Sequence, residues 1–135
     1  MPIMPWSDML SVGVASIDQQ HRILVGILNE LGDSMEAGIG TWDESVAMTR
    51  LVDYTESHFA FEEALMRRVG YADLDAHEQE HRLLFQQVAD LMARSTSGER
   101  LGTQALLVFL RDWLTSHIMG TDRALGLSLN RVGMR

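Results

Sequence analysis

The chain contains no cysteine and no lysine, and only 2 prolines among its 135 residues. Without cysteine it can form neither a disulfide nor a thiolate metal site, and it cannot hold an iron–sulfur cluster through cysteine. Its 11 basic residues are all arginine and form no basic stripe, and 19 acidic residues give a formal net charge of −8. The charge pattern of a DNA- or RNA-binding protein is therefore missing, and we expect no nucleic-acid partner.

The sequence also lacks a long apolar run. No segment is apolar over the length needed to span a bilayer, and the first residues lack the basic start and apolar core of a secretory signal. We therefore expect a soluble, cytoplasmic protein without membrane insertion. The length of 135 residues fits one domain with one hydrophobic core, which predicts a single domain over residues 1–135.

Apolar residues recur at helical spacing in four long segments, which predicts four helices. Short turns separate these helices, so consecutive helices must be antiparallel neighbours. We place the helices at residues 17–37, 42–69, 74–94 and 99–119. The fold class is then all-α, an up-down-up-down four-helix bundle over residues 17–119. Residues 1–15 are expected to form an ordered non-helical arm. Gly120 is expected to end the fourth helix, and residues 121–132 could form a short terminal helix that Gly126 interrupts.

Two pairs of possible metal ligands are each spaced by four residues. His58 and Glu62 form H-x-x-x-E, and His77 and His81 form H-x-x-x-H. On an α-helix this spacing places both side chains of a pair on one face, about one turn apart. The first pair lies late in the second helix and the other early in the third, so an antiparallel hairpin brings both pairs to the same end. Imidazole and carboxylate together suit a transition metal.

The remaining histidines fall in the same layer of the predicted bundle. His21 lies near the start of the first helix and His117 near the end of the fourth, and the depths of all these positions agree to within roughly 10 Å. A single inward histidine is more often a hydrogen-bonded core residue than a ligand. Five unpaired buried imidazoles beside a buried carboxylate, however, would be costly without a cation. Their joint placement therefore favours a metal centre.

Asp122 is a less certain candidate, because it follows His117 by five residues. That spacing does not keep two side chains on one face of an unbroken α-helix. Gly120 and Thr121 lie between them and would permit a turn toward the histidines. Asp122 could equally be a first-turn acid of the terminal helix. The spacing alone leaves both interpretations open.

The number of candidate ligands exceeds what one ion can use. Zinc prefers four ligands and calcium prefers oxygen. Two octahedral ions offer roughly twelve positions, of which five imidazoles, two bridging carboxylates and one bridging oxide or hydroxide would fill all but one. A histidine-rich pair with one open position favours iron and a small diatomic ligand. Ferritin-like di-iron sites instead use four glutamates and two histidines.

With these motifs the chain resembles the hemerythrin family, specifically the single-domain bacterial hemerythrins. The resemblance lies in four stretches: I-D-Q-Q-H ending at His21, H-F-A-F-E at residues 58–62, H-E-Q-E-H at residues 77–81 and H-I-M-G-T-D at residues 117–122. Upstream, Trp6 and the stretch S-V-G-V look like the N-terminal arm of the family. The resemblance implies a non-haem di-iron centre, with a bridging oxide or hydroxide, that binds O₂ reversibly.

The resemblance also implies a role for each candidate. One iron would take His77, His81 and His117, and the other would take His21 and His58 and keep the vacant position. Glu62 and Asp122 would bridge the two ions. Four apolar residues match the O₂ pocket of the family, and each would suit an ordinary bundle core equally well: Phe59, Trp113, Leu114 and Ile118.

We therefore expect an O₂-binding protein rather than an enzyme, for oxygen storage or for delivery to an oxygen-consuming enzyme, and we expect a monomer. One alternative is oxygen or redox sensing through a separate partner protein. The other is reduction of peroxide or nitric oxide at the same centre, which the absence of an evident general acid disfavours.

Overall fold

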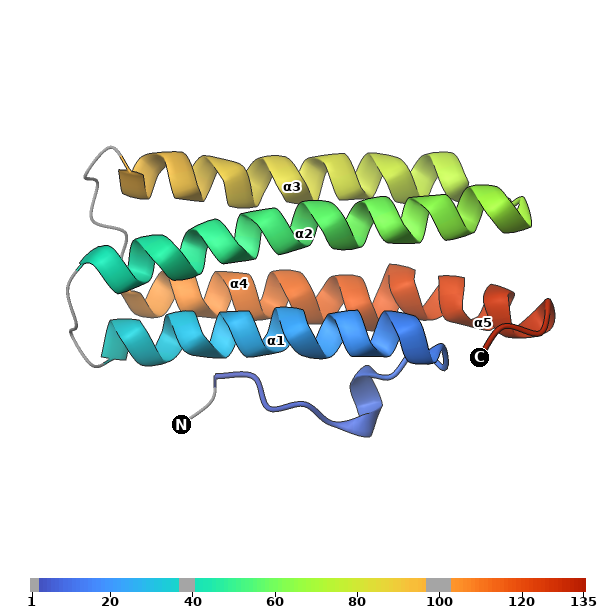
Figure 1. Ribbon diagram of the computed structural model, residues 1–135, viewed down its shortest axis with the longest axis horizontal. Helices are drawn as coiled ribbons and strands as arrows, with labels where there is room; N and C mark the ends of the chain where they lie inside the picture. Colours follow the sequence, from blue (N-terminus) through green and yellow to red (C-terminus); the bar gives the residue numbers. More distant parts are fainter. Residues whose placement is uncertain (1–2, 37–40, 97–102) are drawn as a thin grey trace.

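The computed structural model describes residues 3–36, 41–96 and 103–135, and these residues contain only helices and the segments that join them (Figure 1). A 3₁₀ turn, η1, spans Asp8–Leu10, and a π-helical turn, η2, spans Ile118–Asp122. The α-helices are α1 (Ala15–Glu36), α2 (Thr41–Val69), α3 (Leu74–Thr96), α4 (Thr103–His117) and α5 (Arg123–Arg131).

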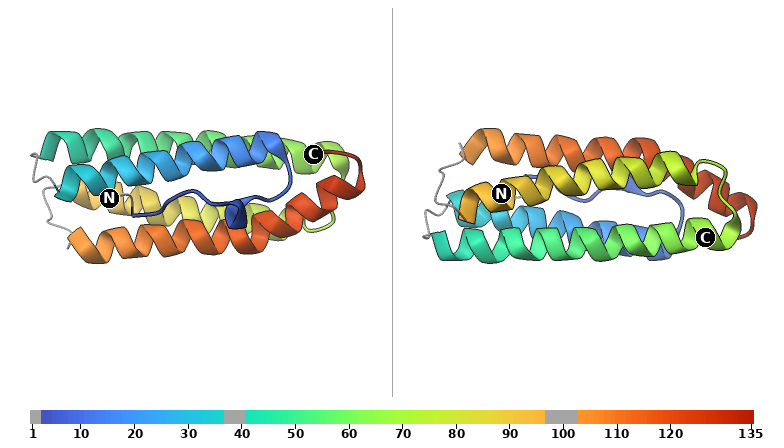
Figure 2. Two further views of the ribbon diagram at one scale, coloured as in Figure 1. Left: turned by 90° about the horizontal axis from the view of Figure 1, so that it is seen from below. Right: turned by 90° about the horizontal axis from the view of Figure 1, so that it is seen from above.

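Helices α1 to α4 lie side by side and run alternately in opposite directions (Figures 1 and 2). This arrangement confirms the predicted all-α four-helix bundle. The expected end of the first helix at residue 37 and the expected start of the fourth at residue 99 lie outside the described residues. Among the described helices, none combines the length and the apolar character needed to cross a membrane.

The core of the bundle follows from the apolar periodicity of each helix. In α1, for example, Leu24, Leu28 and Leu31 are spaced by four and three residues, and none of them is more than 1% exposed. Such spacing aligns the side chains into one stripe that faces the other helices. Burying a leucine of this kind is worth about 1.5–3 kcal/mol relative to leaving it exposed. The stripes therefore fix which face of each helix points inward, including the faces that carry the histidines.

The N-terminal arm lies along the bundle between α1 and α4 (Figure 2). The Met4 N–H donates to Asn29 Oδ1 at 2.9 Å, and Asn29 Nδ2 donates to the Met4 carbonyl at 3.0 Å. The Arg22 guanidinium lies 4.9 Å from the ring centroid of Trp6, a cation–π contact. Farther along, the buried side chains of the arm join the hydrophobic core: Leu10, Val12 and Val14. The arm is therefore part of the core rather than a loose tail.

The helical path at the C-terminal end differs from the prediction. Gly120 does not end the fourth helix, because α4, η2 and α5 follow one another without a break from Thr103 to Arg131. Gly126 does not interrupt the terminal helix either. It lies buried within α5 where the arm crosses, and a Cβ atom built on it would be 1.9 Å from the Val12 carbonyl oxygen. This glycine therefore permits the close approach of two backbones.

We predict that Gly126→Ala lowers the free energy of unfolding by about 1–3 kcal/mol, the usual cost of overpacking a tight site. The added methyl group would force the arm away from α5. The matched control is Gly26→Ala in α1, where a Cβ atom meets nothing within 4 Å. This control should be neutral or stabilising by up to about 1 kcal/mol, because alanine is the better helix former. Equal thermal unfolding of the two variants would contradict the described packing of the arm.

Candidate metal centre

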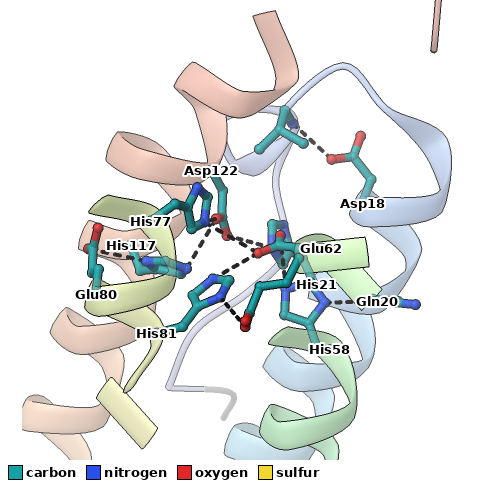
Figure 3. A network of polar contacts seen from close by, with 12 residues as sticks. Asp18, Gln20, His21, His58, Glu62, His77, Glu80, His81, His117 and Asp122 are labelled. Atoms are coloured by element: carbon teal, nitrogen blue, oxygen red, sulfur yellow. Dashed lines mark hydrogen bonds and ion pairs between the residues drawn. The ribbon is translucent and has the colours of Figure 1, made fainter. Parts of the chain in front are cut away.

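The seven side chains proposed as ligands lie together in the interior of the bundle (Figure 3). They come from four helices and the π turn, and none of them is more than 3% exposed. Their possible ligand atoms fall into two groups, and within each group these atoms lie within 4.8 Å of one another. The larger group contains Glu62, His77, His81, His117 and Asp122. The smaller contains His21, His58, Glu62 and Asp122, so both carboxylates belong to both groups.

The turn between α2 and α3 brings the two four-residue motifs face to face. Gly70 ends α2 with a φ of 65°, a left-handed conformation that glycine adopts without steric cost. The Tyr71 N–H donates to the Met66 carbonyl at 2.9 Å, which closes the helix end. Because α3 begins at Leu74, the last turns of α2 and the first turns of α3 are neighbours. His58 and Glu62 therefore meet His77 and His81 in one layer.

The π turn η2 brings Asp122 into the cluster. In an α-helix, five residues would rotate Asp122 about 140° away from His117. In the π turn, the Arg123 N–H donates to the Ile118 carbonyl five residues earlier, so His117 and Asp122 lie on the same side. The Asp122 side chain is fully buried and forms no capping hydrogen bond to α5. Of the two interpretations left open above, the structure supports the turn toward the histidines.

Glu62 lies between two sets of imidazoles. Its Oε1 atom is 3.0 Å from His81 Nε2 and 3.6 Å from His77 Nε2. Its Oε2 atom is 3.2 Å from His58 Nε2 and 3.5 Å from His21 Nε2. One carboxylate oxygen therefore faces each set, which is the orientation that a bridging ligand requires.

Asp122 has the same orientation on the other side of the cluster. Its Oδ1 atom is 3.0 Å from His117 Nε2 and 3.1 Å from His77 Nε2, whereas its Oδ2 atom is 2.9 Å from His21 Nε2. The two carboxylates thus connect the same two sets of histidines.

The donor atoms of this cluster fit a metal centre. Most of them are buried without a hydrogen-bond partner among the described residues: Nε2 of His21, His58, His81 and His117, both oxygens of Glu62, and Oδ2 of Asp122. Each unsatisfied buried polar group costs about 1–3 kcal/mol, and a cation between converging lone pairs removes that cost. Imidazole nitrogen and carboxylate oxygen are ligands that iron accepts. The residues present therefore fit a di-iron site.

Three of the imidazoles are held at Nδ1, the ring nitrogen that points away from the buried carboxylates, by residues that the sequence did not identify. The Nδ1 atoms contact side-chain oxygens in the pairs His58–Gln20 (2.7 Å), His81–Glu63 (3.1 Å) and His117–Glu80 (3.2 Å). An oxygen at Nδ1 accepts the ring proton, so the lone pair of Nε2 points into the centre. Each partner directly follows or precedes a ligand in the sequence, yet it contacts a histidine of another helix. The only signal in the sequence is that each partner adjoins a ligand, and this does not indicate which histidine the partner contacts.

The buried carboxylates raise the pKa of three histidines of the metal-free cluster. Burial lowers the pKa of His21, but the nearby carboxylates of Asp122 and Glu62 outweigh burial and raise this pKa to about 9. The same two carboxylates raise the pKa of His77 to about 9. Burial also lowers the pKa of His117, but the charge of Asp122 and the contact with Glu80 raise it to about 10. Burial raises the pKa of Glu62 and Asp122, but the neighbouring imidazolium groups lower both pKa values overall. A metal ion would have to displace these protons on binding.

The four residues expected to line an O₂ pocket are also buried. Phe59, Leu114 and Ile118 are 5%, 3% and 0% exposed, and Trp113 is 8% exposed. The Phe59 ring stacks on the imidazole of His81, with ring centroids 3.8 Å apart and planes 5° apart. Apolar and aromatic groups thus lie against the ligands, as both a pocket wall and an ordinary core would require. The role of these residues in O₂ binding stays a prediction.

The chain resembles known proteins over most of its length. A family model described as "Hemerythrin HHE cation binding domain" matches residues 12–126. A bacteriohemerythrin of Stenotrophomonas maltophilia is 39% identical over 128 residues, which cover 92% of this chain and 80% of that protein. A bacteriohemerythrin of Methylococcus capsulatus is 34% identical over 131 residues, which cover 96% of this chain and 99% of that protein. The crystal structure titled "hemerythrin:wild-type" matches with a TM-score of 0.86 at 34% identity, covering 93% of this chain and 97% of that one.

We predict that the metal-free protein loses stability as the pH rises from about 7 to about 10. The pKa values of His21, His77 and His117 are raised in the folded state from 6.5 to about 9, 9 and 10. A raised pKa contributes stability that is complete below the unfolded value and is lost as the pH passes the folded value. Urea unfolding of metal-free protein at several pH values measures this loss. The metal-loaded protein is the control, and an equal or rising stability of the metal-free form would contradict the prediction.

Proposed function

The chain belongs to the hemerythrin family, and from this premise we propose that it binds O₂ reversibly at a di-iron centre. The observation that carries the proposal is the division of the buried ligands into two groups that share Glu62 and Asp122. We propose that each group holds one iron ion and that the shared carboxylates bridge the ions, together with an oxide or hydroxide. The group of His21 and His58 has one histidine fewer than the other, which leaves a coordination position for a small ligand.

When bound, two ferrous ions would supply the two electrons that O₂ takes up on binding and returns on release. The chain itself holds and orients the ligands. All five histidines direct Nε2 toward Glu62 or Asp122 at distances of 2.9–3.6 Å. No imidazole of the cluster is therefore left to exchange protons with a substrate, which supports ligand binding rather than enzymatic turnover.

The apolar residues around the ligands would keep water away from the bound O₂. Phe59, Leu114 and Ile118 present no charged or hydrogen-bonding side-chain group, and all three are buried. Excluding water protects a reactive centre from side reactions that would trap it in an oxidised, inactive form. We propose that these residues, with Trp113, form the walls of the O₂ pocket.

For the physiological role we propose oxygen storage, or delivery of O₂ to an oxygen-consuming enzyme, by a monomer in the cytoplasm. The chain spans 99% of the bacteriohemerythrin of Methylococcus capsulatus.

We predict that the iron-loaded protein, reduced under argon, gains colour on exposure to air and loses it again when argon is restored. The cycle should repeat many times, because binding and release leave the protein unchanged. His58→Ala is the control, since it removes a ligand of the group that has the open position, and this variant should not cycle. Irreversible oxidation of the parent protein on first exposure, or fast turnover of peroxide or nitric oxide with a reductant, would contradict the proposal.

We predict that Ile118→Thr accelerates the irreversible oxidation of the O₂-bound protein by about tenfold or more. A hydroxyl group at this fully buried position would attract water or a proton donor to the pocket. Ile118→Val is the matched control, because valine has the shape of threonine without the hydroxyl. The rate is measured as the decay of the visible spectrum in air, below the unfolding temperature of both variants. Equal rates for the two variants would show that Ile118 does not line the pocket.

A further inference from the structure

The two groups of histidines differ in the side chains that contact Nδ1, the ring nitrogen that points away from the buried carboxylates. In the group of three, His81 Nδ1 lies 3.1 Å from Glu63 Oε2 and His117 Nδ1 lies 3.2 Å from Glu80 Oε1. In the group of two, His58 Nδ1 lies 2.7 Å from the amide oxygen of Gln20. Each group also contains one histidine whose buried Nδ1 has no hydrogen-bond partner among the residues that the structure describes: His77 in the group of three and His21 in the group of two. Among the described residues, carboxylates therefore contact Nδ1 of two histidines in the group of three, and of none in the group of two.

This difference affects how strongly each group attracts a cation. A carboxylate that accepts the Nδ1 proton makes the imidazole a stronger donor through Nε2, and it brings a negative charge close to the ion. The neutral amide of Gln20 orients His58 without adding charge. The side chains of Glu63 and Glu80 are 22% and 36% exposed, so both carboxylates lie at the edge of the centre and within reach of water.

Glu80 has a second contact that fixes its position. Its Oε2 atom accepts a hydrogen bond from Thr121 Oγ1 at 2.5 Å, so one carboxylate of α3 joins His117 to the π turn. A surface pocket of about 350 Å³ lies beside it between α3 and α4, and both Glu80 and His117 line this pocket. On this side of the ring, Glu80 holds Nδ1 of His117, while Asp122 lies 3.0 Å from its Nε2.

We infer that the two groups bind metal with unequal affinity and that the group of His77, His81 and His117 fills first. Glu63 and Glu80 set a large part of the difference, as positioning residues that act through His81 and His117. The inference rests on the two-ion centre proposed above. One consequence is a stable one-ion form. Another is that the ion held by His21 and His58, next to the open position, is the one that exchanges.

The test is an anaerobic titration of the metal-free protein with Fe²⁺ in competition with a chromophoric chelator. The expected result is two ions per chain in two steps, with the first step tighter. His58→Ala should keep the tight step and lose the weak one, whereas His81→Ala should lose the tight step. Two steps of equal affinity, or a tight step that survives in His81→Ala, would overturn the inference. Saturation at one ion per chain would instead refute the two-ion centre itself.

The role of the two glutamates is tested by Glu63→Gln and Glu80→Gln. Each should weaken the first step by about 10–100-fold, the usual effect of removing such a partner, and change the second step much less. Glu78→Gln is the matched control. It removes the same charge from α3, but Glu78 pairs with Arg67 and forms no hydrogen bond or ion pair with a histidine among the described residues.

A variant with a smaller change distinguishes a loss of the position of Glu80 from a general loss of folding. Thr121→Val removes only the hydroxyl that holds Glu80, and we expect it to weaken the first step by less than tenfold. Thermal unfolding of each metal-free variant checks that the bundle is intact. If both glutamine variants load like Glu78→Gln, Glu63 and Glu80 do not set the order of filling.

Discussion

The structure depends on the burial of two carboxylates that each face two sets of imidazoles. Glu62 and Asp122 are fully buried, and the oxygen atoms of each point to different histidines. Such a cluster is unfavourable in a protein interior unless cations satisfy the converging lone pairs. The α2–α3 turn and the π turn lie beside this cluster. Together with the packing of the bundle, they bring the carboxylates and the imidazoles together.

Much of this arrangement can be predicted from the sequence because it follows local rules. Apolar periodicity gives the four helices, and short connections make neighbouring helices antiparallel. The four-residue spacing in His58–Glu62 and in His77–His81 then defines a face of each helix. Topology alone brings these faces to one end of the bundle, so the core of the site requires no knowledge of packing.

The parts that could not be predicted depend on contacts between distant segments. Asp122 reaches the cluster only through a π turn, a conformation that local preferences do not specify and that surrounding structure must stabilise. Gly126 reads as a helix breaker, yet its role is to admit the Val12 carbonyl of the arm. The partner of each outward imidazole nitrogen, such as Glu80 for His117, is set by the rotation of one helix against another.

The central claim is that two iron ions occupy the space between the buried carboxylates and the five histidines. The most direct measurement is elemental analysis of freshly purified protein from cells grown in iron-rich medium. The account predicts two iron ions per chain. A preparation of folded protein that contains no iron, or one zinc ion per chain in its place, would contradict it.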